Sequence, residues 1–172
     1  MTLASPLHDF LSADLISVRS DISSRKKLLQ EMANLLSQPL LEQANSEQSD
    51  KADDTEQLFS QKDIYHCLLE REKLGNTGIG NGVALPHSRC QHTSNAIVAI
   101  IILEEAIDYD SIDGQGVDVA FGLLVPQEAT QEHLNLLADI ARLMSNNEHK
   151  AQLAKAHSAQ QVINYIQEWS SA

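Results

Sequence analysis

REKLGNTGIGNGVALPHSR, residues 71–89, is the stretch around which the rest of this chain is organised. Four of the seven glycines of the 172-residue sequence fall within eight positions of it: Gly75, Gly78, Gly80 and Gly82. A glycine inside a regular element costs about 0.5–1 kcal/mol, so the pattern predicts an irregular loop rather than an ordinary helix or strand. Glycine amides can line a concave site for an anion, and Pro86 restricts the backbone that leads into His87. We therefore predict a phosphate-binding loop that holds a histidine.

Two apolar runs follow this loop and predict buried strands. Residues 96–103, AIVAIIIL, are rich in branched side chains and too short for a helix of normal length. They favour a central strand that is buried on both faces. Residues 117–125, VDVAFGLLV, predict a second buried strand that ends at Pro126. The Asp113-Gly114 pair between the two runs is a turn signal.

The segments before the loop predict a short strand and an amphipathic helix. Residues 15–18 are short and partly β-branched, which is typical of a strand. Residues 25–38 carry apolar side chains at helical spacing, with Ser23 or Ser24 available as the N-cap. We expect Pro39 to stop this helix.

Three more helices are signalled elsewhere in the chain. One is expected to begin at Ser60 and to end at Gly75. Another follows Thr130, with an apolar stripe of Leu134, Leu137, Ile140, Ala141 and Met144. The last follows Ser158 and Gln161, which are spaced as a capping box. Strands interleaved with helices predict an α/β layered domain.

The composition is acidic, with 24 Asp and Glu against 12 Lys and Arg and a net charge of −12. Nucleic-acid binding depends on clustered basic side chains, so we expect no nucleic-acid partner. The N-terminus lacks the basic region and apolar run of a signal peptide, and the longest apolar run has eight residues. That run is far shorter than the roughly 20 residues needed to cross a bilayer. With only Cys67 and Cys90 as cysteines, these features favour a cytoplasmic protein without membrane insertion.

Residues 42–57, EQANSEQSDKADDTEQ, contain six acidic residues and one lysine. No apolar side chain in this segment is larger than alanine, so it cannot bury enough surface to offset its ordering entropy. We expect a disordered surface loop. The alternative is an acidic docking segment for a basic partner.

Three other chemistries fit the glycine-rich stretch poorly. No Lys-Ser or Lys-Thr follows the glycines, so it is not a Walker A loop, and GIGNG at residues 78–82 is not the GxGxxG pattern. A metal site could be proposed from His87, Cys90 and His92, but structural zinc needs four ligands and the run offers no second pair. Neither Ser88 nor Cys90 lies on the GxSxG elbow of a hydrolase nucleophile.

His87 has the properties of a phosphoryl acceptor. An imidazole is largely neutral and nucleophilic near neutral pH, and its N–P bond is labile enough to pass the group onward. Such transfer depends mainly on positioning and on neutralisation of charge, which glycine amides and guanidinium groups supply. Arg71 and Arg89 are the guanidinium groups available. An isolated histidine would more simply be a surface or turn residue, but this setting favours the reactive interpretation.

The run REKLGNTGIGNGVALPH resembles the phosphorylation-site motif of the enzyme IIA domains of the fructose/mannitol class in the bacterial phosphotransferase system. Within that class it is most similar to the nitrogen-regulatory enzyme IIA proteins, whose motif runs TREKxGxTGIGNGIAIPH. The similarity extends over most of residues 10–168. It implies a single layered α/β domain with a mixed β-sheet flanked by helices and a disordered acidic insertion at residues 43–57. Ser88 departs from the family, which often has glycine at that position.

The resemblance also implies roles for individual residues. His87 is expected to be the phosphohistidine, and Arg71 to help bind its phosphoryl group. LLVPQEATQEHL places His133 where the family has a second histidine that would orient or hydrogen-bond the reactive imidazole. Without the resemblance, His133 is as readily a solvated residue in a first helical turn. The expected phosphate-binding set, with no metal and no cofactor, is Arg71, Thr77, Gly78, Gly80, Gly82 and Arg89.

The implied activity is that of a phosphotransferase component, a phosphohistidine relay with no small-molecule turnover of its own. An HPr-like phosphocarrier would donate to His87, and the phosphorylation state would regulate nitrogen or potassium metabolism through targets such as potassium transport or sensor proteins. The alternative is a sugar-specific IIA that donates phosphate to the IIB domain of a membrane permease. A third interpretation is a binding module that is never phosphorylated.

Overall fold

The computed structural model describes residues 6–47 and 61–171. Two short 3-10 turns open the described chain, η1 (Pro6–Phe10) and η2 (Ala13–Leu15). The strands are β1 (Ile16–Ser20), β2 (Gly78–Gly80), β3 (Val83–Ala84), β4 (His87–Cys90), β5 (Ile97–Ile107) and β6 (Val117–Pro126). The helices are α1 (Arg25–Glu47), α2 (Gln61–Leu74), α3 (Gln131–Ser145), α4 (Asn147–Ala154) and α5 (Ala159–Ser171).

The strands of the described chain form one mixed sheet in the order β1-β5-β6-β3-β2, and β4 also pairs with β6. The two long central strands β5 and β6 are antiparallel, while β1 is parallel to β5. Strands β3 and β4 follow one another along the same edge of β6, both parallel to it. The mixed sheet flanked by helices is confirmed, and so is the central position of the run at residues 96–103.

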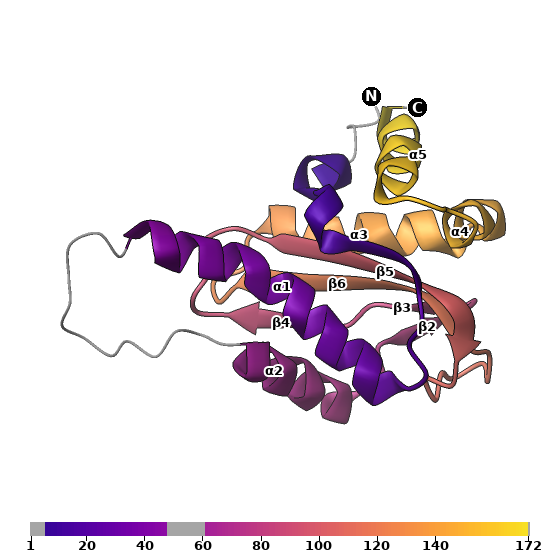
Figure 1. Ribbon diagram of the computed structural model, residues 1–172, viewed down its shortest axis with the longest axis horizontal. Helices are drawn as coiled ribbons and strands as arrows, with labels where there is room; N and C mark the ends of the chain where they lie inside the picture. Colours follow the sequence, from indigo (N-terminus) through magenta and orange to yellow (C-terminus); the bar gives the residue numbers. More distant parts are fainter. Residues whose placement is uncertain (1–5, 48–60, 172) are drawn as a thin grey trace.

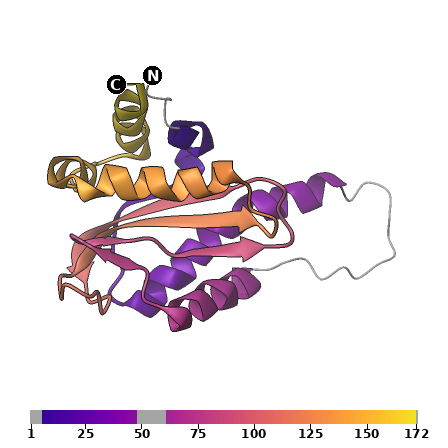
Figure 2. The ribbon, with the colours of Figure 1, turned by 180° about the vertical axis from the view of Figure 1, so that it is seen from behind.

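Helices cover both faces of the sheet (Figure 1). Helices α1 and α2 pack on one face, whereas α3, α4 and α5 lie on the other, as the view from behind also shows (Figure 2). Alternate residues of β5 point to opposite faces. Ala99, Ile101 and Leu103 belong to the core under α1 and α2, and Val98, Ile100 and Ile102 belong to the core under α3 to α5. A strand buried on both faces therefore has a near-continuous apolar sequence.

Helix α1 runs past Pro39, and the prediction that this proline stops the helix is wrong. A proline inside a helix removes one amide donor, which costs about 3 kcal/mol. Burial of Leu36 and Leu40 on either side of Pro39 offsets this cost, because both side chains pack in the core. Residues 43–47, predicted as the start of the disordered insertion, form the last part of the helix. The rest of that insertion, residues 48–57, lies outside the described residues.

The other helix predictions are confirmed only in part. Ser24 accepts from the amide of Lys27 at 3.2 Å, as an N-cap does. The apolar stripe of α3 is partly wrong, because its buried side chains are Leu136, Ile140, Leu143 and Met144, while Leu134 is 51% exposed. Helix α4 was not predicted, although the Asn146 side chain caps it by accepting from two amides. The predicted cap at Ser60 lies outside the described residues. None of the described helices is long and apolar enough to cross a membrane.

Candidate functional site

The glycine-rich stretch is not one irregular loop, and in this respect the prediction is wrong. It contains the short strands β2 and β3, joined by a tight reversal, and then β4. Gly80, Asn81 and Gly82 all have positive φ angles in this reversal, of 87°, 58° and 77°. Glycine reaches such angles without steric cost, which explains the glycines at both ends of the reversal. The run therefore folds as a hairpin that leads into the strand carrying His87.

His87 begins β4 and is half-buried beside Leu123 of β6. Its Nδ1 lies 2.8 Å from the backbone oxygen of Leu85. A carbonyl oxygen only accepts, so Nδ1 carries the proton in the neutral ring and Nε2 keeps its lone pair. Burial lowers the pKa of His87, and the Arg71 charge lowers it further, against the opposing effects of the Leu85 hydrogen bond and the Glu72 charge. The site thus presents a neutral imidazole with a free Nε2.

Arg71 and Glu72 lie at the C-terminal end of α2, next to the start of the hairpin. The Arg71 Nη1 donates to the carbonyl oxygen of Gly75 at 2.9 Å and so caps the helix. Its positive charge is felt by the imidazole of His87, as is the negative charge of Glu72. A guanidinium anchored at this position is available to an anionic group on His87.

His133 occupies the first turn of α3. Its Nδ1 accepts from the amide of Thr130 at 3.1 Å, so in the neutral ring the proton lies on Nε2. Helix α3 packs on the face of the sheet that bears Leu123, the register partner of His87. Paired residues on neighbouring strands point to the same face, so His87 and His133 lie on the same side of the sheet. Their tautomers are complementary, since one ring offers a bare Nε2 and the other an Nε2–H.

The other predicted phosphate-binding residues lie in different places. Thr77 is 3% exposed and its hydroxyl bonds to Glu72. The amide of Gly78 donates to the Asn76 side chain at 2.7 Å. Arg89 is exposed, two residues beyond His87 on the same face, and donates to the Gln127 carbonyl at 3.4 Å. Thr77 and Gly78 are thus already engaged within the protein, whereas Arg89 faces solvent near His87.

Gly80 and Gly82 lie at the far end of the hairpin. Val83 pairs with Val119 of β6, and His87 pairs with Leu123. Four residues of strand separate the two positions by about 13 Å. The amide of Asn81 between the two glycines donates to the Asp113 carboxylate at 2.9 Å. The structure therefore does not bring these glycines to the imidazole, and their phosphate contacts stay a prediction.

The residues considered for a metal site or a thiol nucleophile do not form one group around His87. Cys90 is buried in the core under α2, on the face opposite to His87, so these two side chains do not converge on one metal. Among the described residues no group of three His, Cys, Asp or Glu side chains is placed to hold a metal ion. Burial raises the pKa of both Cys67 and Cys90, which keeps the thiols protonated.

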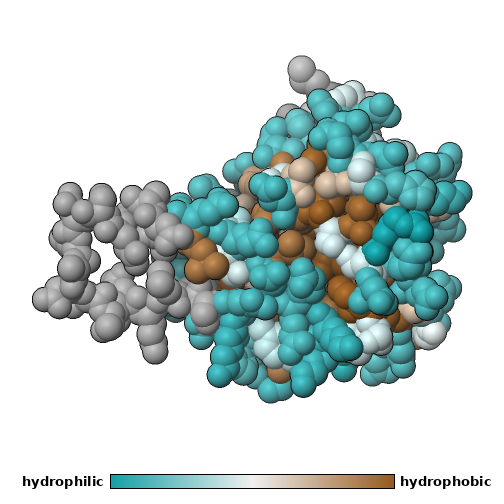
Figure 3. Space-filling model, viewed as in Figure 1, coloured by the Kyte–Doolittle hydropathy of each residue, from teal (hydrophilic) through white to brown (hydrophobic). Residues whose placement is uncertain are grey.

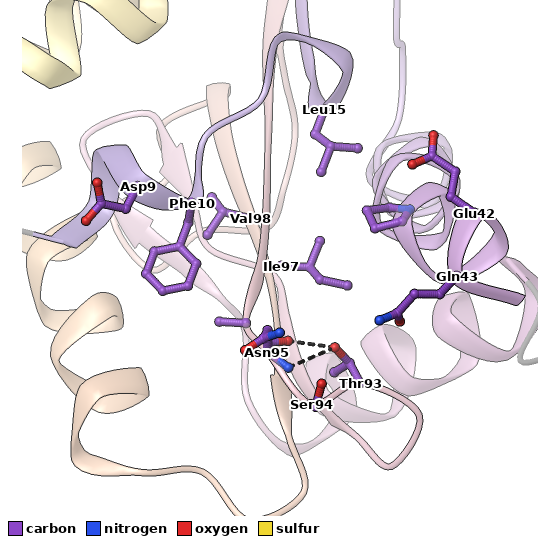
Figure 4. Close-up of a pocket in the computed structure, with 12 residues that line it drawn as sticks. Asp9, Phe10, Leu15, Glu42, Gln43, Thr93, Ser94, Asn95, Ile97 and Val98 are labelled. Carbon is purple, nitrogen blue, oxygen red and sulfur yellow. Dashed lines mark hydrogen bonds between the residues drawn. The ribbon is translucent and has the colours of Figure 1, made fainter. Parts of the chain in front are cut away.

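A cavity of about 530 Å³ lies away from His87, between η1, the end of α1 and the loop before β5. Its lining includes Phe10, Leu15 and Ile97 on the apolar side and the carboxylates of Asp9 and Glu42 (Figure 4). Figure 3 shows apolar surface gathered between α1 and the layer of η1 and α5. No histidine, lysine or arginine occurs among the described residues that line the cavity. It is therefore not the place where an anion would meet the imidazole.

The fold and the site together define a class of protein, a small α/β domain with an imidazole poised at the edge of its sheet. Residues 9–169 match the family model described as "Phosphoenolpyruvate-dependent sugar phosphotransferase system, EIIA 2". The chain belongs to this enzyme IIA family and is thus a component of a phosphotransfer system.

Similar proteins agree with this assignment. The chain is 36% identical to the nitrogen regulatory protein of Pseudomonas aeruginosa, over 83% of this chain and 82% of that protein. The crystal structure of nitrogen regulatory protein IIA-Ntr from Neisseria meningitidis has a TM-score of 0.77 at 33% identity, covering 92% of this chain and 97% of that one. IIA mannitol from Escherichia coli shares the fold, with a TM-score of 0.65 at 15% identity over 91% of this chain and 98% of that one.

Sequence reasoning missed three residues: Leu85, which contacts the His87 ring, Glu72, whose charge acts on it, and Tyr109, which contacts Glu72. Leu85 supplies the carbonyl that fixes the ring, a role of its backbone that its apolar side chain does not signal. Glu72 is part of the motif, but its position in the sequence does not indicate which residues its carboxylate contacts. Tyr109 lies 37 residues from the carboxylate that it contacts, so only the fold brings them together.

Proposed function

We propose that this protein is a phosphohistidine relay component that accepts a phosphoryl group on Nε2 of His87 from an HPr-like phosphocarrier. The observation that carries the proposal is the hydrogen bond from His87 Nδ1 to the Leu85 carbonyl, 2.8 Å long. It leaves Nε2 as the only ring nitrogen with a free lone pair. A half-buried imidazole whose pKa is lowered stays neutral, and therefore nucleophilic, near neutral pH.

The transfer step follows from this arrangement. The Nε2 lone pair of His87 attacks the phosphorus on the phosphohistidine of the carrier, and the N–P bond to the carrier's imidazole breaks. The carrier's ring leaves with the electron pair of that bond. The His87 ring gains positive character, and its Nδ1–H, directed at the Leu85 oxygen, stabilises that charge. No proton needs to move between the two reacting nitrogens.

Arg71 and His133 would act on the phosphoryl oxygens. The guanidinium of Arg71 stays charged throughout and suits an anionic group. His133 Nε2–H, left free by the Thr130 hydrogen bond to Nδ1, would donate to an oxygen of the same group. Both groups would neutralise the negative charge of the phosphoryl group, which water reaches poorly because His87 is half-buried.

We further propose a regulatory role in a nitrogen-type branch of the phosphotransferase system. The likeness to nitrogen regulatory proteins, at 36% identity over most of both chains, supports it. The ratio of the phosphorylated to the unphosphorylated form would then regulate nitrogen or potassium metabolism through target proteins such as potassium transport or sensor proteins. The alternative is a sugar-specific IIA that donates to a IIB domain, which the family description, a sugar phosphotransferase system, favours.

Reconstitution tests the acceptor role. The wild-type protein is incubated with enzyme I, an HPr-like carrier and radiolabelled phosphoenolpyruvate, beside His87→Gln and the exposed α2 control His66→Gln. We expect acid-labile label on the wild type and on His66→Gln, and none on a folded His87→Gln. Label on His87→Gln would remove this residue as the acceptor, and an unlabelled wild type would favour the binding module. Adding a purified IIB domain then separates the two roles, since efficient onward transfer to it supports the sugar-specific alternative.

A further inference from the structure

The carboxylate of Glu72, whose charge acts on His87, accepts hydrogen bonds from two other residues of the protein. Glu72 accepts from the hydroxyl of Tyr109 at 2.7 Å and from the amide of Thr77 at 3.2 and 3.3 Å to its two oxygens. It also accepts from the hydroxyl of Thr77. Thr77 and Tyr109 are 3% and 0% exposed, so these donors have little access to water. A buried donor that loses its acceptor costs about 1–3 kcal/mol, so the arrangement holds all three residues in place.

Tyr109 is itself fixed from two further elements. The Asn76 side chain donates to its backbone oxygen at 2.9 Å, and Arg25 at the start of α1 donates to the same oxygen at 3.3 Å. The Arg25 guanidinium also lies 5.8 Å from the centre of the tyrosine ring. Burial, followed by the hydrogen bond to Glu72, raises the pKa of Tyr109, so the phenol keeps its proton and stays a donor. The carboxylate therefore meets a donor that cannot easily move away.

A short series of hydrogen bonds connects Glu72 to the reactive ring. Thr77, held by its amide and its hydroxyl, accepts from the amide of Leu85 through its own carbonyl at 2.9 Å. The next peptide is pinned as well, because the amide of Leu123 donates to the Pro86 oxygen at 3.0 Å. The carbonyl of Leu85 lies between these two fixed points and accepts from His87 Nδ1 at 2.8 Å. The position of the acceptor that selects the His87 tautomer thus depends on Thr77.

We propose that Glu72 is a positioning residue of the phosphoryl-accepting site, acting through Thr77 and Leu85 to hold His87 with its proton on Nδ1 and its Nε2 free. Tyr109, in the loop between β5 and β6, fixes the Glu72 carboxylate through its hydroxyl. Glu72 does not touch the transferred group in this role. The proposal rests on the proposed function of His87 for its kinetic consequence, but its structural consequence is measurable in the unphosphorylated protein.

Matched substitutions test this assignment. Glu72→Gln keeps the shape of the side chain but replaces one acceptor oxygen by an NH2 donor. Both carboxylate oxygens accept from the Thr77 amide, which only donates, so one of these two acceptors is lost. Tyr109→Phe removes the hydroxyl that donates to Glu72 and that contacts the Thr77 hydroxyl at 3.0 Å, and it leaves the bonds from Thr77 to Glu72. Glu70→Gln is the control on the same helix, since Glu70 is exposed and pairs with Lys73 at 2.8 Å. The ¹⁵N chemical shifts of the His87 ring report its tautomer, and rapid-quench labelling reports phosphoryl acceptance.

We expect a single Nδ1–H tautomer in the wild type and in Glu70→Gln. In Glu72→Gln we expect a mixture of both tautomers, a lower His87 pKa because the nearby negative charge is lost, and acceptance slower by about tenfold or more. Tyr109→Phe should change the tautomer mixture and the rate in the same direction by a smaller amount, without the loss of negative charge that lowers the His87 pKa in Glu72→Gln. A folded Glu72→Gln with the wild-type tautomer and rate would overturn the proposal. If Glu72→Gln does not fold, an unchanged tautomer and rate in Tyr109→Phe would overturn it instead.

The two proposals fail separately in this experiment. A wild type that takes no label, together with a tautomer that changes in Glu72→Gln, contradicts the acceptor role of His87 and supports the positioning by Glu72. A labelled wild type whose tautomer is indifferent to Glu72→Gln supports the acceptor role and contradicts the positioning.

Discussion

Lys150 of α4 and Asp118 of β6 form an ion pair, with Nζ and Oδ1 2.6 Å apart, directly beside the Cα of Gly82. Both side chains are largely shielded, at 19% and 27% exposure. A methyl group on Gly82 would lie 2.8 Å from the lysine nitrogen and 3.2 Å from the carboxylate oxygen. The glycine at this position is therefore explained by the ion pair and by its φ of 77°, without any bound phosphate.

Gly82→Ala should destabilise the fold by about 2–3 kcal/mol, because it combines a positive φ with a crowded Cβ. Gly114→Ala is the matched control. Gly114 has a φ of 71° and open space around it, so its cost should be only about 1 kcal/mol. Urea denaturation measures both. In the folded fraction, labelling of His87 should stay within about twofold of wild type for both variants. Native stability combined with lost labelling in Gly82→Ala would restore the phosphate-binding role.

Arg71→Ala should have two separable effects. Loss of its bond to the Gly75 carbonyl should reduce the free energy of unfolding by about 0.5–1.5 kcal/mol. Loss of the guanidinium should slow phosphoryl acceptance by about 100-fold, since a charged donor at the transferring group is absent. The His87 pKa should also rise, because the Arg71 charge lowers it. Lys73→Ala, an exposed cation on the same helix, should change neither rate nor pKa, and equal effects of the two would discount Arg71.

His133 offers a pair of substitutions that separate its two nitrogens. Asn places an acceptor where Nδ1 binds the Thr130 amide but lacks the distal donor, whereas Gln carries a donor near the position of Nε2. His133→Asn should therefore keep the stability of α3 and slow onward transfer by about tenfold or more. His133→Gln should retain most of the transfer rate and also the cap of α3, because glutamine at this third helical position can accept from the Thr130 amide. Rapid-quench experiments measure the rates of phosphoryl acceptance and return. Identical rates in His133→Asn, His133→Gln and the His66→Ala control would exclude His133 from the site.

Stability should depend on pH through His87. Burial lowers its pKa below the ordinary 6.5, so the unfolded chain binds a proton more readily than the folded chain does. The stability that the neutral ring contributes is therefore complete above the unfolded pKa. It decreases as the pH falls from the unfolded pKa toward the lower pKa of the folded state. Relative to His87→Gln, the wild type should become less stable as the pH is lowered from about 8 to about 5. An NMR titration of His87 with a midpoint at or above 6.5 would contradict this prediction.

The sequence by itself determined the central strands, most of the helices and the candidate for the reactive group. Branched apolar runs that are too short for an ordinary helix favour central strands, so β5 and β6 were predicted. The proline-histidine pair behind the glycines singled out His87 as the candidate. Pairing and faces were a different matter. A period of two residues shows that a strand has two faces but does not say which neighbour, or which layer of helices, each face meets.

The tertiary structure decided everything that depends on contacts between distant segments. Residues 83–90 pair with β6 in a register that carries Gly80 and Gly82 away from His87 and turns the ring toward the side of α3. Packing of Leu36 and Leu40 carries α1 through Pro39 against its local preference. Glu72 meets Tyr109 across 37 positions of chain. Such contacts follow from the burial of shared surface, which no local pattern of residues encodes, and so the support around the imidazole became visible only in the folded protein.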